Sequence, residues 1–256
     1  MKKDSLSFLE KRVILPILSQ LALPKHVGFI MDGNRRYAKN LKEPSITGHR
    51  MGFDALSSVL LWCFELGLSE VSVYTFSLDN FSRSQEEVEY LMTLAAEKLN
   101  LMCEPDSFVM RRNIKVKICG DIALIRSDVR EAFEKIQALT VSHTGGQFNI
   151  MFAYSSKREL SRAVDIATHT VKGSEISQVS WQAIEDNLYN KTPVDLIVRT
   201  SGETRLSDFM IWQIQPRKTL IVFEKSLWPE YNISAFIFSL LRYSVHARTF
   251  ASPSSQ

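Results

Sequence analysis

Cysteine is scarce in this chain, and no two cysteines stand at a metal-binding spacing. Only three of the 256 residues are cysteines, namely Cys63, Cys103 and Cys119, and no CxxC pair occurs. An odd count without such pairs supports neither a disulfide framework nor a zinc site. The sequence therefore favours a reducing compartment.

A large excess of one charge is also lacking. The formal net charge is +3, from 31 Lys and Arg against 28 Asp and Glu. No basic run is interleaved with aromatic residues in the way that a phosphate-tracking surface requires. We therefore expect no nucleic-acid partner, and any anionic ligand would bind at a local site.

No apolar run approaches the roughly 18 residues that would span a bilayer. Residues 1–23 are expected to form an amphipathic helical segment with a kink at Pro16. Its apolar positions at helical spacing are Leu6, Leu9, Val13, Ile17 and Leu21. This face would pack on its own domain or on a partner, or else touch a membrane surface.

Several common catalytic motifs are missing as well. The chain contains no GxxxxGK[ST], GxGxxG, GxSxG or HExxH sequence. Ser77 and Ser201 have no histidine near them in sequence, so a serine nucleophile is not predicted. The sequence points to electrostatic activation of a ligand rather than to covalent catalysis.

What the chain does contain is a regular alternation of apolar runs and helical segments. Runs at 26–31, 70–76, 113–119, 147–154, 194–200 and 219–223 predict strands. Segments at 51–66, 85–103, 127–139, 157–171 and 179–189 have the composition or spacing of helices. This alternation is typical of an α/β fold with a mostly parallel sheet.

Polar side chains follow these strands at the point where each strand ends. The carboxyl ends of parallel strands lie at one edge of a sheet, where open α/β folds bind ligands. That edge would bring together Asp32, Asn34, Arg36, Ser77, Asn80, Arg83, Arg199, Arg205 and Ser207. One carboxylate among arginines, amides and hydroxyls suits a polyphosphate held with a divalent cation.

Each of these residues has a simpler interpretation when it is taken alone. Asp32 could cap the following helix, and DGN is a common turn. A lone arginine at a strand end is usually solvated, and His49 could merely stand near a helix start. Arg35 and Lys39 could belong to a solvated helix face. Gly33 and Gly202, which permit close backbone approach, favour the joint interpretation as a phosphate site.

Longer motifs then identify a resemblance to a known family. They are His26, MDGNRRYA at 31–38, GH at 48–49, FSxxNFxR at 76–83, RTSGExRxSDFxxWQ at 199–213 and LWPEY at 227–231. Together they resemble the cis-prenyltransferases, that is the undecaprenyl and dehydrodolichyl diphosphate synthases, over residues 24–245. RRYAK and RLSDF look most like the eukaryotic dehydrodolichyl diphosphate synthase branch.

The resemblance implies a single catalytic domain over residues 24–245. It would have a central six-stranded, mainly parallel sheet surrounded by helices, as in undecaprenyl diphosphate synthase, and a dimeric assembly. The activity implied is Mg²⁺-dependent condensation of isopentenyl diphosphate in cis onto an allylic starter such as farnesyl diphosphate. Residues 246–256 would be a flexible tail.

Site roles follow from the resemblance residue by residue. Asp32 would bind the metal and help the allylic diphosphate leave. The allylic diphosphate site would comprise Gly33, Asn34, Arg35, Arg36 and His49. Arg199, Arg205 and Ser207 would hold isopentenyl diphosphate. Ser77, Asn80 and Arg83 would lie between the two substrates, with Asn80 helping to remove a proton. The tunnel candidates, which are also ordinary core candidates, are Phe53, Leu56, Val59, Leu60, Val88, Leu91, Met92 and Leu94.

Two departures from the family pattern bear on assembly. Leu220 stands where bacterial members place a second metal-ligating glutamate, and no Arg-x-Gly element follows Trp228. We expect a partner subunit of the Nogo-B receptor type to supply that element. Such a partner would hold the enzyme peripherally on the cytosolic face of the endoplasmic reticulum membrane.

The apolar run near the C-terminus would either face this partner or pack on the chain's own sheet. It comprises Ile233, Phe236, Ile237, Leu240, Leu241 and Val245. The expected function is therefore the catalytic subunit of a heteromeric enzyme that makes polyprenyl diphosphate for dolichol and protein glycosylation. The alternatives are a single-component homodimer with a shorter product and a non-catalytic subunit of the complex.

Overall fold

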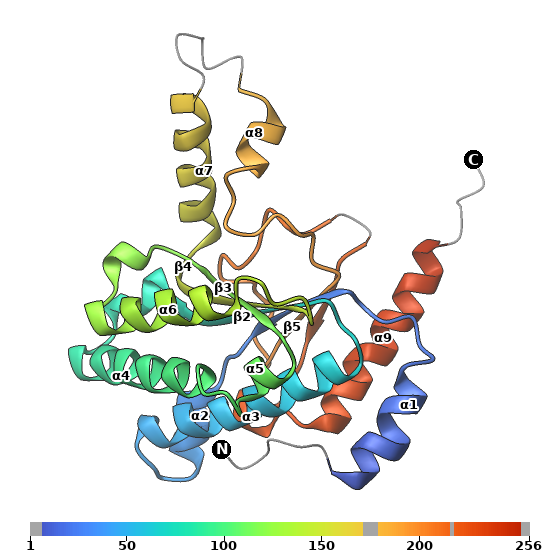
Figure 1. Cartoon of the computed structure of the whole chain (residues 1–256). Coiled ribbons are helices and arrows are strands. Elements are labelled where there is room, and N and C mark those ends of the chain that lie inside the picture. The colour runs from blue at the N-terminus through green and yellow to red at the C-terminus, as the bar shows by residue number, and fades with distance from the viewer. Residues whose placement is uncertain (1–6, 171–178, 216–217, 252–256) are drawn as a thin grey trace.

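The computed structural model describes residues 7–170, 179–215 and 218–251. Its centre is one sheet of six strands in the order β3-β4-β2-β1-β5-β6, and every neighbouring pair is parallel (Figure 1). The strands are β1 (His26–Ile30), β2 (Glu70–Ser77), β3 (Lys115–Cys119), β4 (Gln147–Tyr154), β5 (Leu196–Arg199) and β6 (Leu220–Phe223). All six predicted strands and the predicted α/β class are confirmed.

The central strands β1 and β5 are mostly apolar and fully buried because both faces of the sheet are covered there. All five residues of β1 are buried. Val27 and Phe29 belong to the larger core, whereas Ile30 belongs to the core on the other face. Two-sided burial of this kind is the rule for parallel sheets.

Most helices cover one face of the sheet, as Figure 1 shows for α3, α4, α6 and α9. Their side chains form the larger apolar core with the strands. The α-helices are α1 (Leu15–Leu18), α2 (Asn34–Asn40), α3 (Ser45–Glu65), α4 (Gln85–Met102), α5 (Phe108–Arg111), α6 (Ser127–Thr140), α7 (Ser156–Thr170), α8 (Trp181–Glu185) and α9 (Ile233–Ala251). The short helices are η1 (Glu10–Ile14), η2 (Leu78–Ser82), η3 (Ile122–Leu124) and η5 (Trp228–Glu230). Among the described residues, no helix combines the length and apolar character needed to cross a bilayer.

The other face of the sheet carries a buried polar network beside its smaller apolar core. The Glu70 carboxylate accepts hydrogen bonds from the side-chain amides of Asn149 at 2.5 Å, Asn190 at 2.6 Å and Gln147 at 3.3 Å. These donors stabilise a carboxylate that would otherwise be costly to bury. The network therefore fixes the segment around Asn190 against the middle of the sheet.

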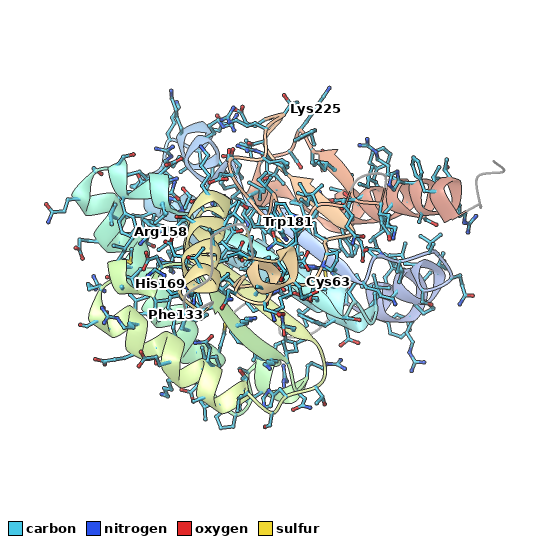
Figure 2. All side chains as sticks on the ribbon, turned by 90° about the horizontal axis from the view of Figure 1, so that it is seen from above. Cys63, Phe133, Arg158, His169, Trp181 and Lys225 are labelled. Atoms are coloured by element: carbon cyan, nitrogen blue, oxygen red, sulfur yellow. The ribbon has the colours of Figure 1, made fainter. Side chains whose placement is uncertain are left out.

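Helices α7 and α8 extend away from the sheet (Figure 1). They share a small apolar cluster of their own, and Trp181 of α8 is 72% exposed (Figure 2). The predicted helix over 179–189 is shorter than expected, because α8 ends at Glu185. The chain then turns, which brings Asn190 into the buried network.

The N-terminal segment is helical, and most of its expected apolar face is exposed, while Leu21 of that face packs against the larger core. Leu15 and Leu18 are buried, whereas Leu9, Val13 and Ile17 are exposed. The irregularity expected at Pro16 is the π-helical turn η1, in which the Leu15 N–H donates to the Glu10 carbonyl. Proline has no N–H and crowds the preceding turn, so the wider turn accommodates it. Leu6 lies outside the described residues.

The C-terminal helix α9 extends further than predicted. It continues to Ala251, so the expected tail from residue 246 begins as helix, and residues 252–256 lie outside the described part of the chain. Phe236 and Leu240 are buried in the larger core, whereas Leu241 and Val245 are exposed. The apolar run therefore packs partly on the chain's own sheet and leaves a second stripe on the surface.

Candidate active site

The candidate site lies where β1 and β5, which are neighbours in the sheet, end side by side. The chain leaves β1 towards β2 on one side and leaves β5 towards β6 on the other. Diverging connections of this kind open a crevice at the carboxyl ends of the strands. Asp32 follows β1, and Arg199 ends β5, so the topology brings both to this crevice.

The turn after β1 is held by the segments that follow β5 and β6. The Asp32 N–H donates to Thr200 Oγ1 at 3.0 Å, and the Trp228 N–H donates to the Asp32 carbonyl at 3.0 Å. Gly33 has a φ of 110°, and an added Cβ would lie 2.9 Å from Leu227 Cδ2. Glycine is needed here both for its backbone conformation and for the close approach of Leu227. The LWPEY motif therefore positions Asp32.

Arg199 makes the central ion pair of the site. Its Nη2 donates to Asp32 Oδ2 at 2.8 Å, and its Nη1 donates to Ser207 Oγ at 2.7 Å and to the Arg205 carbonyl at 2.5 Å. Its side chain is only 4% exposed. The Nε atom is buried and has no hydrogen-bond acceptor among the described residues. One donor of this buried guanidinium is therefore still available to a ligand oxygen.

The charge of Asp32 is set by this environment. Burial acts to raise the pKa of the carboxyl group, but the hydrogen bond and charge of Arg199 and the charge of Arg36 outweigh it. The pKa of Asp32 therefore lies below its ordinary value. Asp32 is a carboxylate at neutral pH, as a metal ligand must be.

Glu203 lies between Arg36, which follows β1, and Arg205, which follows β5. Arg36 Nη2 lies 3.5 Å from Glu203 Oε1 and 3.7 Å from Asp32 Oδ1. Arg205 donates to the other oxygen of Glu203, although its side chain is 63% exposed. Arg36 also donates to Ser201 Oγ at 2.5 Å. Asp32, Arg36, Arg199, Arg205 and Ser207 thus form one connected cluster, as predicted.

The loop that follows β5 adopts an uncommon backbone at several residues. Ser201, Ser207 and Asp208 have φ values of 79°, 49° and 60°. Such conformations cost energy in residues other than glycine and are concentrated at functional sites. The Ser156 N–H at the start of α7 donates to the Asp208 carbonyl at 2.9 Å and helps to hold the loop.

A second cluster, formed by His49, Arg83, Arg35 and Glu87, lies beside the first. Glu87 accepts a hydrogen bond from Arg83 at 2.8 Å and lies 3.5 Å from His49 Nε2 and 4.0 Å from Arg35 Nη1. Burial and the charge of Arg83 lower the pKa of His49 despite the nearby Glu87. His49 is therefore neutral at pH 7 and can donate or accept a hydrogen bond.

Ser77 and Asn80 bond to each other rather than to the arginines. Asn80 Oδ1 accepts the Ser77 N–H at 3.1 Å, and the two residues form a capping box at the start of η2. The amide oxygen of Asn80 thus holds the local backbone. Its predicted part in proton removal stays a prediction.

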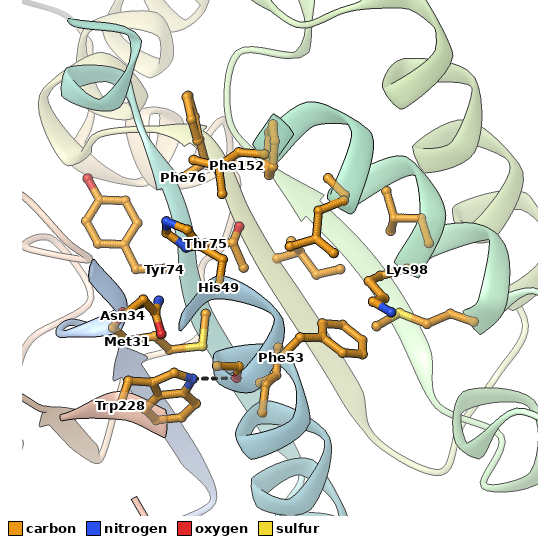
Figure 3. Close-up of a pocket in the computed structure, with 18 of the residues that line it drawn as sticks. Met31, Asn34, His49, Phe53, Tyr74, Thr75, Phe76, Lys98, Phe152 and Trp228 are labelled. Carbon is orange, nitrogen blue, oxygen red and sulfur yellow. Dashed lines mark hydrogen bonds between the residues drawn. The ribbon is translucent and has the colours of Figure 1, made fainter. Parts of the chain in front are cut away.

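An apolar cavity extends from this edge between α3, α4 and the sheet (Figure 3). Asn34, His49 and Trp228 lie at the end nearest the site, where the Trp228 indole donates to the Gly52 carbonyl at 2.7 Å. Of the tunnel candidates, Phe53, Leu56, Leu91 and Leu94 line the cavity. Val59 and Met92 are buried core residues, Val88 packs against the core, and Leu60 lines a neighbouring cavity.

Sequence reasoning missed Glu87, Glu203 and Thr200 as members of the site. Glu87 lies in the first turn of α4, four residues after Arg83, which stands just before the N-cap Ser84, and the two side chains meet there. Glu203 lies inside the RTSGETR motif between two arginines that had been assigned. Both signals were present in the sequence. The Thr200 contact with the β1 turn depends on strand pairing and left no local signal.

Comparisons with known proteins identify similar sequences and structures. Residues 30–251 match the family described as "Putative undecaprenyl diphosphate synthase". The dehydrodolichyl diphosphate synthase complex subunit of Homo sapiens is 37% identical over 249 residues, which cover 96% of this chain and 74% of that protein. A subunit of the same description from Schizosaccharomyces pombe is 36% identical over 230 residues, 87% of this chain and 86% of that one.

A solved structure is similar over most of its length. Lavandulyl diphosphate synthase from Lavandula x intermedia, in complex with dimethylallyl diphosphate, superposes with a TM-score of 0.81 and 25% identity. The match covers 87% of this chain and 95% of that one. The parallel sheet and the surrounding helices are therefore a shared architecture.

Proposed function

This chain belongs to the undecaprenyl diphosphate synthase family and is a cis-prenyl diphosphate synthase, and we propose that it is the catalytic subunit of a heteromeric enzyme. It would condense isopentenyl diphosphate in cis onto farnesyl diphosphate or a similar allylic starter. The product would be a long-chain dehydrodolichyl diphosphate that serves dolichol synthesis and protein glycosylation. The observation that carries this proposal is the Asp32–Arg199 pair, which joins two halves of one cationic site.

The allylic half would be formed by the residues after β1 and by the neighbouring cluster. Arg36, Arg35 and His49 would hold the allylic diphosphate, with Gly33 and Asn34 close to its oxygens. The apolar cavity begins at Asn34 and His49, so the prenyl chain would enter it as the diphosphate is held at the edge. Neutralising the diphosphate in this way makes it a better leaving group.

The isopentenyl half would be formed by the segment after β5. Arg205 and Ser207 would bind the diphosphate of isopentenyl diphosphate, and the buried Arg199 Nε would donate to one of its oxygens. Arg199 also fixes Asp32, so it would hold the two substrates in a constant relative position. Orientation of this kind removes much of the entropic barrier of a two-substrate reaction.

The residues present fit a magnesium ion held jointly by protein and substrate. Among the described residues, no three histidine, cysteine or acidic side chains are grouped as a metal cage. Asp32 is a single, partly exposed carboxylate, and Mg²⁺ is commonly bound by one or two carboxylates with substrate phosphates. Asp32 would hold the ion, which would supply positive charge to the leaving diphosphate.

A partner subunit would complete the enzyme. The human and fission-yeast relatives are named as subunits of a complex. This chain carries an exposed apolar stripe on α9, formed by Phe238, Leu241 and Val245, and a protein partner would cover it. We propose a partner of the Nogo-B receptor type and a peripheral place on the cytosolic face of the endoplasmic reticulum membrane.

Isopentenyl incorporation tests this proposal. The purified chain, alone and together with its candidate partner, would be given farnesyl diphosphate, radiolabelled isopentenyl diphosphate and Mg²⁺. We expect incorporation by the pair and little by the lone chain. Equal activity of the lone chain would contradict the partner requirement and favour a single-component enzyme. No incorporation by either would favour a non-catalytic subunit.

Substitution of Arg205 separates the two substrate sites. We expect Arg205→Ala to raise the KM for isopentenyl diphosphate by about 10- to 100-fold, because a charge-assisted hydrogen bond is lost. The KM for the allylic substrate should change little. Steady-state kinetics with each substrate varied in turn would measure both values.

The control for this variant is Arg158→Ala. Arg158, like Arg205, pairs with a carboxylate, here Asp121, 2.9 Å away just after β3, but it lies outside the two clusters of the site. Its replacement should leave both KM values unchanged. An Arg205 effect confined to the allylic substrate would mean that the two sites are assigned in reverse.

A further inference from the structure

The loop that carries Ser207 is attached to the first turn of α7. The Ser156 N–H donates to the Asp208 carbonyl at 2.9 Å, and the Lys157 N–H donates to Asp208 Oδ2 at 3.2 Å. Ser155 accepts from the next two N–H groups of α7 through its hydroxyl and its carbonyl. The first turn of a helix needs such acceptors, because its N–H groups have no partner within the helix. Asp208, 51 residues after Lys157, therefore completes the cap of α7.

Two further contacts hold the same loop on either side of Asp208. The Ile211 N–H donates to Ser156 Oγ at 2.7 Å. On the other side, the Tyr74 hydroxyl of β2 donates to the Ser207 carbonyl at 3.3 Å. The Ser207 side chain is itself exposed, so no surrounding core fixes its direction. The direction of Ser207 Oγ therefore depends on how the backbone of this loop is held.

That backbone is strained at the residues that matter. Ser207 and Asp208 have φ values of 49° and 60°, in the left-handed region. Aspartate and asparagine enter this region more readily than most residues, because their short polar side chains form local hydrogen bonds. A strained conformation persists only where the surrounding contacts hold it. The two bonds from Asp208 to α7 are such contacts.

A carboxylate is an unexpected neighbour for a diphosphate site. Ser207 Oγ accepts from Arg199 Nη1 at 2.7 Å, and the buried Arg199 Nε has no acceptor among the described residues, so a ligand oxygen is expected beside them. A free negative charge on the next residue, Asp208, would repel a diphosphate. The start of α7 offsets this effect, because its N–H groups and the helix dipole stabilise a carboxylate there. The position of Asp208 is thus explained by α7 rather than by the ligand.

We propose that Asp208 is a positioning residue for the isopentenyl half of the site, which acts by attaching the Ser207 loop to α7. The inference rests on the proposed function, since it assumes that this loop binds isopentenyl diphosphate. With the attachment intact, Ser207 Oγ and the Arg205 carbonyl stay where Arg199 can donate to both. Without it the loop would occupy other arrangements, and the apparent affinity would fall with the fraction that remains competent to bind.

Three substitutions of Asp208 separate the cap from the backbone and from the charge. Kinetics with each substrate varied in turn would use the assembly that is active in the incorporation assay. Asp208→Ala should raise the KM for isopentenyl diphosphate by about tenfold and leave the allylic KM unchanged, because a helix cap is lost. Asp208→Gly, which suits the left-handed backbone but has no cap, should also raise it. Asp208→Asn should restore the wild-type KM, because asparagine both caps helices and tolerates this backbone.

The matched control is Ser180→Ala, which removes the cap of another helix. Ser180 Oγ accepts the Ala183 N–H at 3.1 Å at the start of α8. This variant should keep both KM values, and thermal unfolding should show all four variants folded.

Three results would overturn the inference while the diphosphate site stands. They are a wild-type KM for isopentenyl diphosphate in Asp208→Ala or Asp208→Gly, an equal rise of both KM values in Asp208→Ala, and a loss in Asp208→Asn as large as in Asp208→Ala. The last of these would mean that the charge matters and not the cap. If the wild-type assembly incorporates no isopentenyl units, the proposed function fails and the inference falls with it.

Discussion

Replacement of Asp32 by asparagine is expected to lower turnover by at least about a hundredfold while the protein stays folded. Asparagine has the same shape, but it lacks the negative charge that Asp32 retains in this site. The pKa of Asp32 lies below its ordinary value because Arg199 and Arg36 outweigh the effect of burial. Without that charge the site loses its metal ligand and the counter-ion of a buried arginine. Single-turnover kinetics would measure the chemical step directly.

The control for the Asp32 variant is Asp121→Asn. Asp121 also follows a strand and also pairs with an arginine, Arg158. It should keep the wild-type rate, and circular dichroism should show both variants folded. An Asp32→Asn enzyme that retains most of the wild-type rate would remove Asp32 from its assigned role.

In the wild type, the lowered pKa of Asp32 predicts how the site responds to pH. Asp32 should stay charged, and its ion pair with Arg199 should stay intact, down to pH values below the ordinary pKa of aspartate.

The central strands β1, β4 and β5 could be predicted closely from the sequence because they are buried on both faces. Such a strand is mostly apolar along its length, and β4 was predicted with its observed bounds of 147–154, although it also contains the buried Asn149. Helix ends were less certain. The spacing of apolar residues over 179–189 could not show that the chain turns after Glu185 to place Asn190 in the Glu70 network. That turn depends on contacts with the distant strand β2.

The N-terminal segment shows that periodicity alone does not tell which side of a helix packs on the chain's own core. The spacing of Leu9, Val13 and Ile17 predicted an apolar side that would meet the chain's own domain, a partner or a membrane surface. These side chains are exposed, whereas Leu15 and Leu18 are buried. The π-helical turn before Pro16 adds a residue to the helical repeat, yet Leu9, Val13 and Ile17 all remain on the exposed side. Trp62 reinforces the observed register, since its indole donates to Glu10 Oε1 at 3.0 Å.

The site could be predicted as a set of strand ends but not as a network of contacts. A parallel sheet brings Asp32 and Arg199 to one edge, and this follows from the order of elements alone. The contacts of Arg199 depend in addition on how the loop 200–210 folds. This loop allows the guanidinium to donate to Asp32, Ser207 and the Arg205 carbonyl at once. That loop contains several left-handed residues that sequence propensity disfavours. Local rules fail there, as is expected at a strained functional site.

Arg199→Lys is expected to lower kcat/KM for both substrates by at least about a hundredfold. Lysine keeps the positive charge but has one nitrogen on a flexible stem, whereas the planar guanidinium meets Asp32, Ser207 and the Arg205 carbonyl at once. At least two of these charge-assisted bonds would be lost. The effect should appear for both substrates because Arg199 connects the two halves of the site. Kinetics with each substrate varied would separate this result from that of Arg205→Ala.

The same conservative change at Arg158 provides the comparison. Arg158 uses its Nε and Nη2 atoms to bind Asp121, so Arg158→Lys breaks a similar pair at a different strand end. It should leave kcat/KM unchanged for both substrates.

The Arg199→Lys protein itself should remain folded, because a cation is still present to balance Asp32, and thermal unfolding would verify this. A loss limited to isopentenyl diphosphate would show that Arg199 serves one substrate only. The Asp32–Arg199 pair would then no longer be the link between the two halves.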